Sequence, residues 1–145
     1  MRYITNSPEE TYSVAAKFAK ELNIGDVITL DGDLGAGKTA FTGGLAYGLG
    51  LSDVVSSPTF TIVNEYRKGN IPLFHFDVYR LESEDDLYDI GWDDYLLNNG
   101  ICVVEWSSIV PGLFTMPHYK ITIKKNLDIS DDYREIMIEK IGGEI

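Results

Sequence analysis

Apolar residues recur along the first part of the chain at helical spacing. A helix is predicted to begin at Ser7, a capping residue that is followed by Pro8 and, at capping-box distance, by Glu10. Its apolar face comprises Val14, Ala15, Phe18, Ala19 and Leu22. A short buried strand is predicted at 27–30, and a second helix at 38–49 that ends before Gly50.

Most of the remaining apolar positions form short runs typical of strands. The runs at 59–66 and 73–79 flank a turn, which predicts an antiparallel hairpin. A continuous apolar run covers 101–105 and predicts a buried strand. Polar and apolar residues alternate at 119–124 and at 134–139, which predicts a second hairpin with one exposed face.

Two acidic helical segments are predicted at 83–90 and 92–97, with a break at Gly91. No repeat, linker or low-complexity tract divides the sequence, so residues 1–145 are expected to form a single domain. The mixture of elements predicts an α/β sandwich whose central sheet is mostly parallel and carries antiparallel hairpin additions.

Charge and cysteine content restrict the function classes. The net charge is −11, from 12 basic and 23 acidic residues, which opposes direct binding of a nucleic-acid backbone and favours a basic protein partner. Cys102 is the single cysteine, no run reaches the length of a membrane helix, and the N-terminal residues do not read as a signal peptide. A cytoplasmic protein without membrane contact is therefore expected.

The strongest chemical signal is a phosphate-binding loop between the strand at 27–30 and the helix at 38–49. Its pattern is Gly-x4-Gly-Lys-Thr over residues 32–39, in the strand–loop–helix context that the motif requires. It predicts a P-loop NTPase three-layer sandwich that binds ATP and Mg²⁺. Backbone amides and the helix N-terminus are expected to hold the phosphates. The predicted nucleotide contacts in this loop are Gly32, Asp33, Gly35, Ala36, Gly37, Lys38, Thr39 and Ala40.

A P-loop needs an acidic residue to complete its magnesium site, usually at the carboxyl end of a strand. Two candidates follow apolar strands, namely Asp77 and Glu105. Carboxyl ends of strands face the ligand crevice in open α/β sheets, so one acid is expected on the metal and the other on the attacking water. Spacing alone leaves open which residue has which role.

Other polar and aromatic residues give weaker signals. Thr59 is placed where nucleotide-sensing segments commonly lie, and sensing and a simple strand start are equally compatible with its position. His75 alternates with two phenylalanines and is interpreted as a hydrogen-bonded structural histidine, while Cys102 is interpreted as a packing residue. His118 is placed in a loop, and Trp106 is assigned to the core in preference to a partner contact.

Several motifs in the same order resemble one protein family. They are G-D-L-G-A-G-K-T at 32–39, S-P-T-F-T at 57–61, H-F-D-V-Y-R-L at 75–81, the Gly91–Trp92 turn and V-E-W at 104–106. Together with Glu10-Thr11 and Arg134, they are similar to the TsaE (formerly YjeE) family of bacterial tRNA threonylcarbamoyladenosine biosynthesis ATPases. The resemblance covers nearly the whole chain.

The resemblance implies a minimal ATPase that works with two further proteins. Together they place a threonylcarbamoyl group on N6 of adenosine 37 in tRNA, and ATP hydrolysis by this subunit drives turnover of the complex. Activity of the isolated subunit is expected to be weak, and tRNA is expected to be contacted only through the partners.

The resemblance also assigns roles to residues of this sequence. Thr39 and Glu105 hold Mg²⁺, Lys38 contacts the phosphates, and Asp77 serves hydrolysis. Thr59 falls in the switch segment of the family.

Thr11 is placed near the nucleotide base by the same resemblance. Two positions depart from the family pattern: Ala40 stands where a hydroxyl residue is often found, and Ser107 where a proline commonly follows Glu-Trp.

Three other functions are alternatives to this one. A GTPase needs N-K-x-D and D-x-x-G motifs, and the sequence contains neither. A small-molecule kinase needs several lid arginines, whereas only Arg67 and Arg80 lie near the relevant strands. A regulatory ATP-binding module with vestigial hydrolysis remains open.

Overall fold

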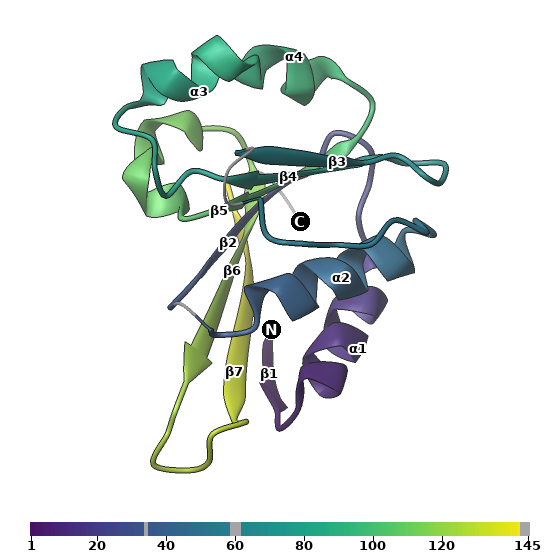
Figure 1. Cartoon of the computed structure of the whole chain (residues 1–145), viewed down its shortest axis with the longest axis vertical. Coiled ribbons are helices and arrows are strands. Elements are labelled where there is room, and N and C mark those ends of the chain that lie inside the picture. The colour runs from purple at the N-terminus through teal and green to yellow at the C-terminus, as the bar shows by residue number, and fades with distance from the viewer. Residues whose placement is uncertain (34, 59–61, 143–145) are drawn as a thin grey trace.

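A single mixed sheet forms the centre of the protein (Figure 1). The computed structural model describes residues 1–33, 35–58 and 62–142. Within them the strand order is β1-β7-β6-β2-β5-β4-β3. The strands are β1 (Arg2–Thr5), β2 (Val27–Gly32), β3 (Val63–Tyr66), β4 (Leu73–Asp77), β5 (Ile101–Glu105), β6 (His118–Lys125) and β7 (Arg134–Ile141).

The sheet is parallel at its centre and antiparallel towards both edges. Strand β2 pairs in parallel with β5 and β6, and β5 pairs in parallel with β4. Strand β3 pairs with β4 in the first predicted hairpin, and β6 with β7 in the second. Strand β1, which the sequence pattern did not predict, pairs with β7. The carboxyl ends of β2, β5 and β4 therefore meet at one edge of the sheet.

Helices cover both faces of the sheet, which gives the predicted three-layer arrangement (Figure 1). Helices α1 (Pro8–Ala19) and α2 (Lys38–Gly48) lie on one face. The other face is covered by α3 (Glu84–Ile90), α4 (Trp92–Leu97) and the 3₁₀ helices η1 (Ser107–Ile109) and η2 (Pro111–Leu113). Gly91, at φ +105°, separates α3 from α4 as predicted.

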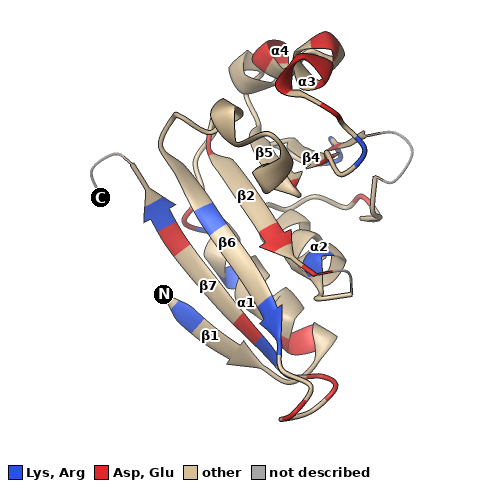
Figure 2. Ribbon diagram, turned by 90° about the vertical axis from the view of Figure 1, so that its left-hand side faces the viewer, with Lys and Arg blue, Asp and Glu red and all other residues tan. Residues whose placement is uncertain are grey.

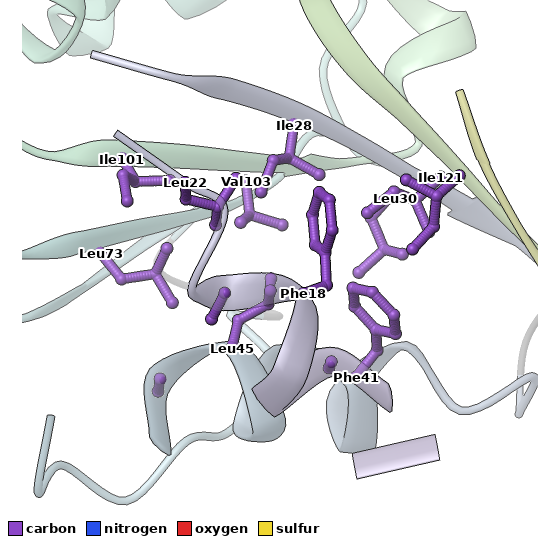
Figure 3. Packing of buried hydrophobic residues seen from close by; sticks show 14 of the residues in the cluster. Phe18, Leu22, Ile28, Leu30, Phe41, Leu45, Leu73, Ile101, Val103 and Ile121 are labelled. Carbon is purple, nitrogen blue, oxygen red and sulfur yellow. The ribbon is translucent and has the colours of Figure 1, made fainter. Parts of the chain in front are cut away.

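Strand β5 is buried on both faces and divides the core in two. Ile101 and Val103 face α1 and α2, whereas Cys102 and Val104 face the opposite layer. Figure 3 shows the first of these clusters, in which side chains of both helices pack against β2, β4, β5 and β6. Burial on both faces explains why the sequence of this strand is continuously apolar and does not alternate.

The Ser7 side chain caps α1, as predicted, by accepting a hydrogen bond from the Glu10 backbone N–H at 3.1 Å.

Small residues allow α1 and α2 to pack closely. A Cβ atom added at Gly44 would lie 2.2 Å from the Tyr12 carbonyl oxygen and 2.8 Å from the Ala15 Cβ. Gly44 is therefore required by the helix contact, although glycine is a poor helix former.

We expect Gly44→Ala to lower the free energy of unfolding by about 1–3 kcal/mol, because overpacking against a backbone carbonyl outweighs the helix propensity gained. Gly43→Ala is the matched control, since its added Cβ would meet only the Tyr12 ring, at 3.3 Å, and that side chain can turn aside. Urea unfolding of both variants tests this. Equal midpoints for the two variants would contradict the packing argument.

Charge is distributed unevenly over the surface. Figure 2 shows acidic residues concentrated on α3 and α4, whereas β1 and β6 carry lysine or arginine and β7 carries residues of both charges. The acidic residues of the two helices are Glu84, Asp85, Asp86, Asp89, Asp93 and Asp94. None of the helices in the described part of the chain combines the length and apolar character needed to cross a bilayer.

Cys102 is a packing residue, as its position in the sequence indicated. It is 2% exposed, and burial raises the pKa of its thiol to about 12.

We expect no reaction of the Cys102 thiol in the folded protein with a thiolate-selective reagent at pH 8.5, and complete reaction after unfolding in guanidinium. Because the thiolate forms more readily in the unfolded chain, stability should also fall as the pH rises above about 9. Rapid labelling of the folded protein would contradict the assigned burial.

Candidate active site

The phosphate loop begins where β2 reaches the edge of the sheet. A Cβ atom at Gly32 would lie 2.7 Å from the Ile123 carbonyl oxygen, so the close approach of β6 requires glycine here. Gly35 and Gly37 have φ values of +78° and +104°, which favour glycine. The glycines of the motif therefore shape the loop, as the sequence pattern predicted.

Helix α2 directs its N-terminus at the loop. Its capping residue is Gly37, no side chain caps it, and its first turn holds no acidic residue. Such an N-terminus presents backbone amides and a positive dipole end to an anion. Lys38 lies at the same place, with its Nζ donating to the Gly32 carbonyl oxygen at 2.7 Å.

The two candidate acids lie side by side. Asp77 ends β4 and Glu105 ends β5, and the two residues are register partners in the parallel pair. Glu105 is buried, and its Oε1 lies 3.9 Å from the Lys38 Nζ. The pKa of Asp77 is raised, mainly by burial and also by the nearby charge of Glu105. A hydrogen bond that its carboxylate accepts from the Tyr79 backbone N–H acts in the opposite direction and lowers the pKa.

His75 is hydrogen-bonded, as interpreted from the sequence, but its partner belongs to the site. Its ring is fully buried, its Nε2 bonds to the Glu105 Oε2, and its Nδ1 lies 3.2 Å from the Tyr66 hydroxyl. His118, which was placed in a loop, instead begins β6, and its Nδ1 lies 2.9 Å from the Met116 carbonyl oxygen.

Trp106 packs partly against the core, as favoured from the sequence, and its ring also lies beside Lys38 of the loop. It is half-buried and adopts a left-handed backbone conformation at φ 63°, which costs a residue with a Cβ about 1–2 kcal/mol. This turn places the indole ring with its centroid 3.9 Å from the Lys38 Nζ and 4.9 Å from the Tyr79 ring centroid. The ring therefore forms a wall of the site.

One cavity of about 490 Å³ joins these groups. Lys38, Thr39, Asp77 and Glu105, which the sequence assigned to phosphate, metal and hydrolysis, all line it. The remaining lining residues among those described are Gly35, Gly37, Ser57, Ile62, Tyr79, Arg80 and Trp106.

Other predicted contacts that the structure describes are not among the lining residues of this cavity. Ala36 is fully buried in the core, and its N–H donates to the Asp33 carbonyl oxygen at 2.9 Å. Thr11 is buried, bonds to the Thr5 hydroxyl at 2.7 Å, and has its methyl group 4.0 Å from where a Gly37 Cβ would lie. Ala40 follows Thr39 on α2, and Thr59 lies outside the described residues.

The donor set suits a magnesium ion that is shared with a nucleotide. Among the described residues, no group of three or more His, Cys, Asp and Glu side chains could hold a metal ion alone. Mg²⁺ bound beside a nucleotide usually takes one or two protein oxygens, with phosphate oxygens and waters as its other ligands. The Thr39 hydroxyl and the Glu105 carboxylate, which line the cavity next to the phosphate loop, fit that pattern.

Comparison with known proteins identifies the family. The model of the family "Threonylcarbamoyl adenosine biosynthesis protein TsaE" matches residues 5–136. A Bacillus subtilis protein described as tRNA threonylcarbamoyladenosine biosynthesis protein TsaE is 45% identical over 99% of this chain and 87% of its own length. The chain belongs to the TsaE family.

Further relatives agree with this membership. A Treponema pallidum protein described as TsaE is 39% identical and covers 95% of this chain and 99% of its own length. The crystal structure of Bacillus subtilis YdiB is similar with a TM-score of 0.82 and 41% identity, over 98% of this chain and 86% of that one. This TsaE-family chain therefore has a P-loop NTPase fold, which confirms the predicted fold class.

Arg134, at the start of β7, contacts the phosphate loop of this TsaE-family protein. The sequence had given it no role. Its Nε donates to the Ala36 carbonyl oxygen at 2.9 Å and its Nη2 to that of Gly35 at 3.3 Å. Its Nη1 donates to the Asp131 and Tyr133 carbonyl oxygens. The guanidinium thus ties the β6–β7 hairpin to the phosphate loop.

Ser107, one of the two departures from the TsaE pattern, also makes a specific contact. Its backbone N–H donates to the Asp31 Oδ1 at 3.0 Å and its hydroxyl to the Oδ2 at 2.7 Å. A proline at this position would lack both donors. In this chain the contact fixes the end of β5 against the end of β2.

We expect Arg134→Ala to weaken nucleotide binding about tenfold, because charge-assisted hydrogen bonds of about 1.5–3 kcal/mol that fix the loop are lost. Lys124→Ala is the control, since it removes the same charge from an exposed position on the neighbouring strand. Equilibrium titration of ATP measures both variants. Equal affinities for the two variants would leave Arg134 without a role in loop geometry.

Proposed function

We propose that this chain is the Mg²⁺-dependent ATPase subunit of the bacterial machinery that forms N6-threonylcarbamoyladenosine at position 37 of tRNA. In this proposal residues 1–145 act as one P-loop ATPase domain. Hydrolysis drives turnover of a complex with two further proteins, in the cytoplasm, where tRNA and ATP are found. The excess of acidic over basic residues favours indirect contact with tRNA through those partners.

The observation that carries the proposal is the convergence of four groups on one cavity. Lys38 and Thr39 reach it from the start of α2, and Asp77 and Glu105 from the ends of β4 and β5. This combination of a phosphate loop with two acids suits phosphoryl transfer to water, because little covalent chemistry is needed beyond positioning and charge stabilisation.

Each group has a distinct proposed role. Lys38 and the loop amides bind the phosphates, with the contacts running from Gly32 to Ala40, and Thr39 and Glu105 hold Mg²⁺. When bound, Mg²⁺ neutralises charge on the phosphate oxygens. Asp77, at the same edge of the sheet, orients the attacking water.

Two further roles rest on the family resemblance. Thr59 senses the nucleotide from the switch segment, and Thr11 lies near the base. Thr11 is buried beside the first turn of α2, so in this proposal it acts by supporting that turn.

Two alternatives are less well supported. A small-molecule kinase clamps the transferred group with several arginines. All four arginines lie in the described part of the chain, and Arg80 alone lines the cavity. A regulatory ATP-binding module would keep the loop but not need two acids at the cavity, and stimulation of hydrolysis by partners separates that alternative from the proposal.

Site variants test the assigned roles. We expect Lys38→Ala to abolish measurable ATP binding, and Glu105→Gln to weaken Mg-ATP binding tenfold or more while binding without metal changes little. Asp77→Asn should keep ATP affinity and lose about 10²-fold or more in turnover, the usual effect of losing a general base. Calorimetry and phosphate release measure these effects, with Lys120→Ala, an exposed lysine on β6, as control. Wild-type turnover in the Lys38 and Glu105 variants would overturn the site.

The role in tRNA modification needs the partners. Steady-state hydrolysis by this chain should be slow alone and rise severalfold when the two partner proteins are added. Tight Mg-ATP binding without stimulation would favour the regulatory module.

A further inference from the structure

A buried line of hydrogen bonds connects a segment beside the cavity to Glu105. The Tyr66 hydroxyl lies 2.9 Å from the Ser56 carbonyl oxygen and accepts from the Ser56 N–H at 3.2 Å. The same hydroxyl lies 3.2 Å from the His75 Nδ1, and the opposite ring nitrogen bonds to the Glu105 Oε2. The line runs through β3, β4 and β5 beneath the surface of the site.

We propose that His75, held by Tyr66, is the positioning residue that orients the Glu105 carboxylate towards the magnesium ion and links it to the segment at Ser56. The inference deepens the proposed function and rests on it. His75 touches neither nucleotide nor metal in this proposal, and it acts through Glu105.

The available protons define the direction of the His75–Glu105 bond. A carboxylate has no proton to donate, so the His75 Nε2 must carry the hydrogen in this bond. On a ring that carries its hydrogen on Nε2, Nδ1 is an acceptor, so the Tyr66 hydroxyl bonds to it by donating its proton, and the Ser56 carbonyl oxygen competes for the same proton. His75 therefore holds one oxygen of Glu105 and leaves Oε1, which lies 3.9 Å from the Lys38 Nζ, directed at the site.

Packing alone does not explain why a histidine and a tyrosine occupy positions 75 and 66. His75 is fully buried and Tyr66 is 4% exposed, and both lie on the sheet face that is otherwise lined by apolar residues such as Leu73. Aliphatic side chains would fill this space without the cost of desolvating polar groups. A buried polar pair at this position is useful because it fixes the geometry of a neighbouring carboxylate, as groups behind metal ligands commonly do.

The hydrogen bonds between Tyr66 and Ser56 also couple Glu105 to the segment beside the cavity. Ser57, the next residue, lines the cavity, and the Asn64 side chain donates to the Ser56 carbonyl oxygen at 3.1 Å. A displacement of this segment by a bound nucleotide changes the partner of the Tyr66 hydroxyl, and therefore the restraint on His75. Glu105 is in this way coupled to the segment without direct contact between them.

The test compares His75→Leu with His75→Gln. The leucine fills the space but cannot donate, whereas the glutamine amide retains a donor near the Nε2 position. Phe74→Leu is the matched control, because Phe74 is equally buried on the same strand but faces the opposite layer. Mn²⁺ binding to the protein–ADP complex is followed by electron paramagnetic resonance, ADP affinity is measured in EDTA, and thermal unfolding is recorded for each variant.

We expect His75→Leu to weaken Mn²⁺ binding about tenfold or more, the usual loss when a group behind a metal ligand is removed. ADP affinity in EDTA should stay within about twofold. His75→Gln should recover most of the metal affinity, and Phe74→Leu should lower the unfolding temperature and leave metal affinity unchanged. Unchanged metal affinity in His75→Leu, or an equal loss in Phe74→Leu, would overturn the positioning role.

Tyr66→Phe gives a second route to the answer if His75→Leu does not fold. We expect it to weaken Mn²⁺ binding by a smaller factor, and to add nothing in the His75→Gln background if the two residues act as one line. Full additivity of the two changes would contradict the link. Glu105→Gln separates the two proposals. If this variant binds the metal as the wild type does, the proposed function is refuted. If it loses metal affinity while the His75 and Tyr66 variants keep theirs, only this inference is refuted.

Discussion

The site depends on a buried carboxylate that the fold must keep charged and in place. Glu105 is 3% exposed, and an ionised carboxylate at that depth is strongly unfavourable unless it is paired and hydrogen-bonded. Its two oxygens have different neighbours: His75 bonds to one, and the Lys38 ammonium lies 3.9 Å from the other. Removing either neighbour leaves part of a buried charge uncompensated, so the phosphate loop, β4 and β5 have to be assembled together. This requirement makes the arrangement of the site a property of the whole sheet.

Parallel pairing at the centre of the sheet meets this requirement. Because β2, β5 and β4 run in the same direction, the loop after Gly32 and the carboxylates of Glu105 and Asp77 arrive at one edge. The hairpins then add groups from behind. Strand β3 brings Tyr66 against His75, and the β6–β7 hairpin brings Arg134 against the loop carbonyls. The antiparallel additions are therefore part of the site as well as of the sheet, since one holds His75 behind Glu105 and the other contacts the carbonyl oxygens of the phosphate loop.

The predictable features are those encoded locally. Glycine spacing predicted the loop, and apolar runs ending in an acid predicted that Asp77 and Glu105 would lie at one edge, because strand polarity determines where carboxyl ends meet. The contact of Arg134 with Ala36 spans 98 positions, and no local pattern encodes it. The sequence favoured the core for Trp106, and the ring packs partly against it, but no local pattern encodes the left-handed backbone turn by which the same ring also lines the cavity. Strand β1 has only four residues, too few for a periodic pattern, and depends on pairing with β7.

The turn after β5 illustrates how fold and site constrain each other. Trp106 stays in an unfavourable conformation only if the residues on both sides are held. Glu105 on one side is held by His75, and Ser107 on the other by two hydrogen bonds to Asp31. With both neighbours held, the indole ring is kept over Lys38, where its face attracts the ammonium group. A proline at position 107 would support this turn by restricting φ. Ser107, which departs from the family pattern, supports the same turn by hydrogen bonding instead.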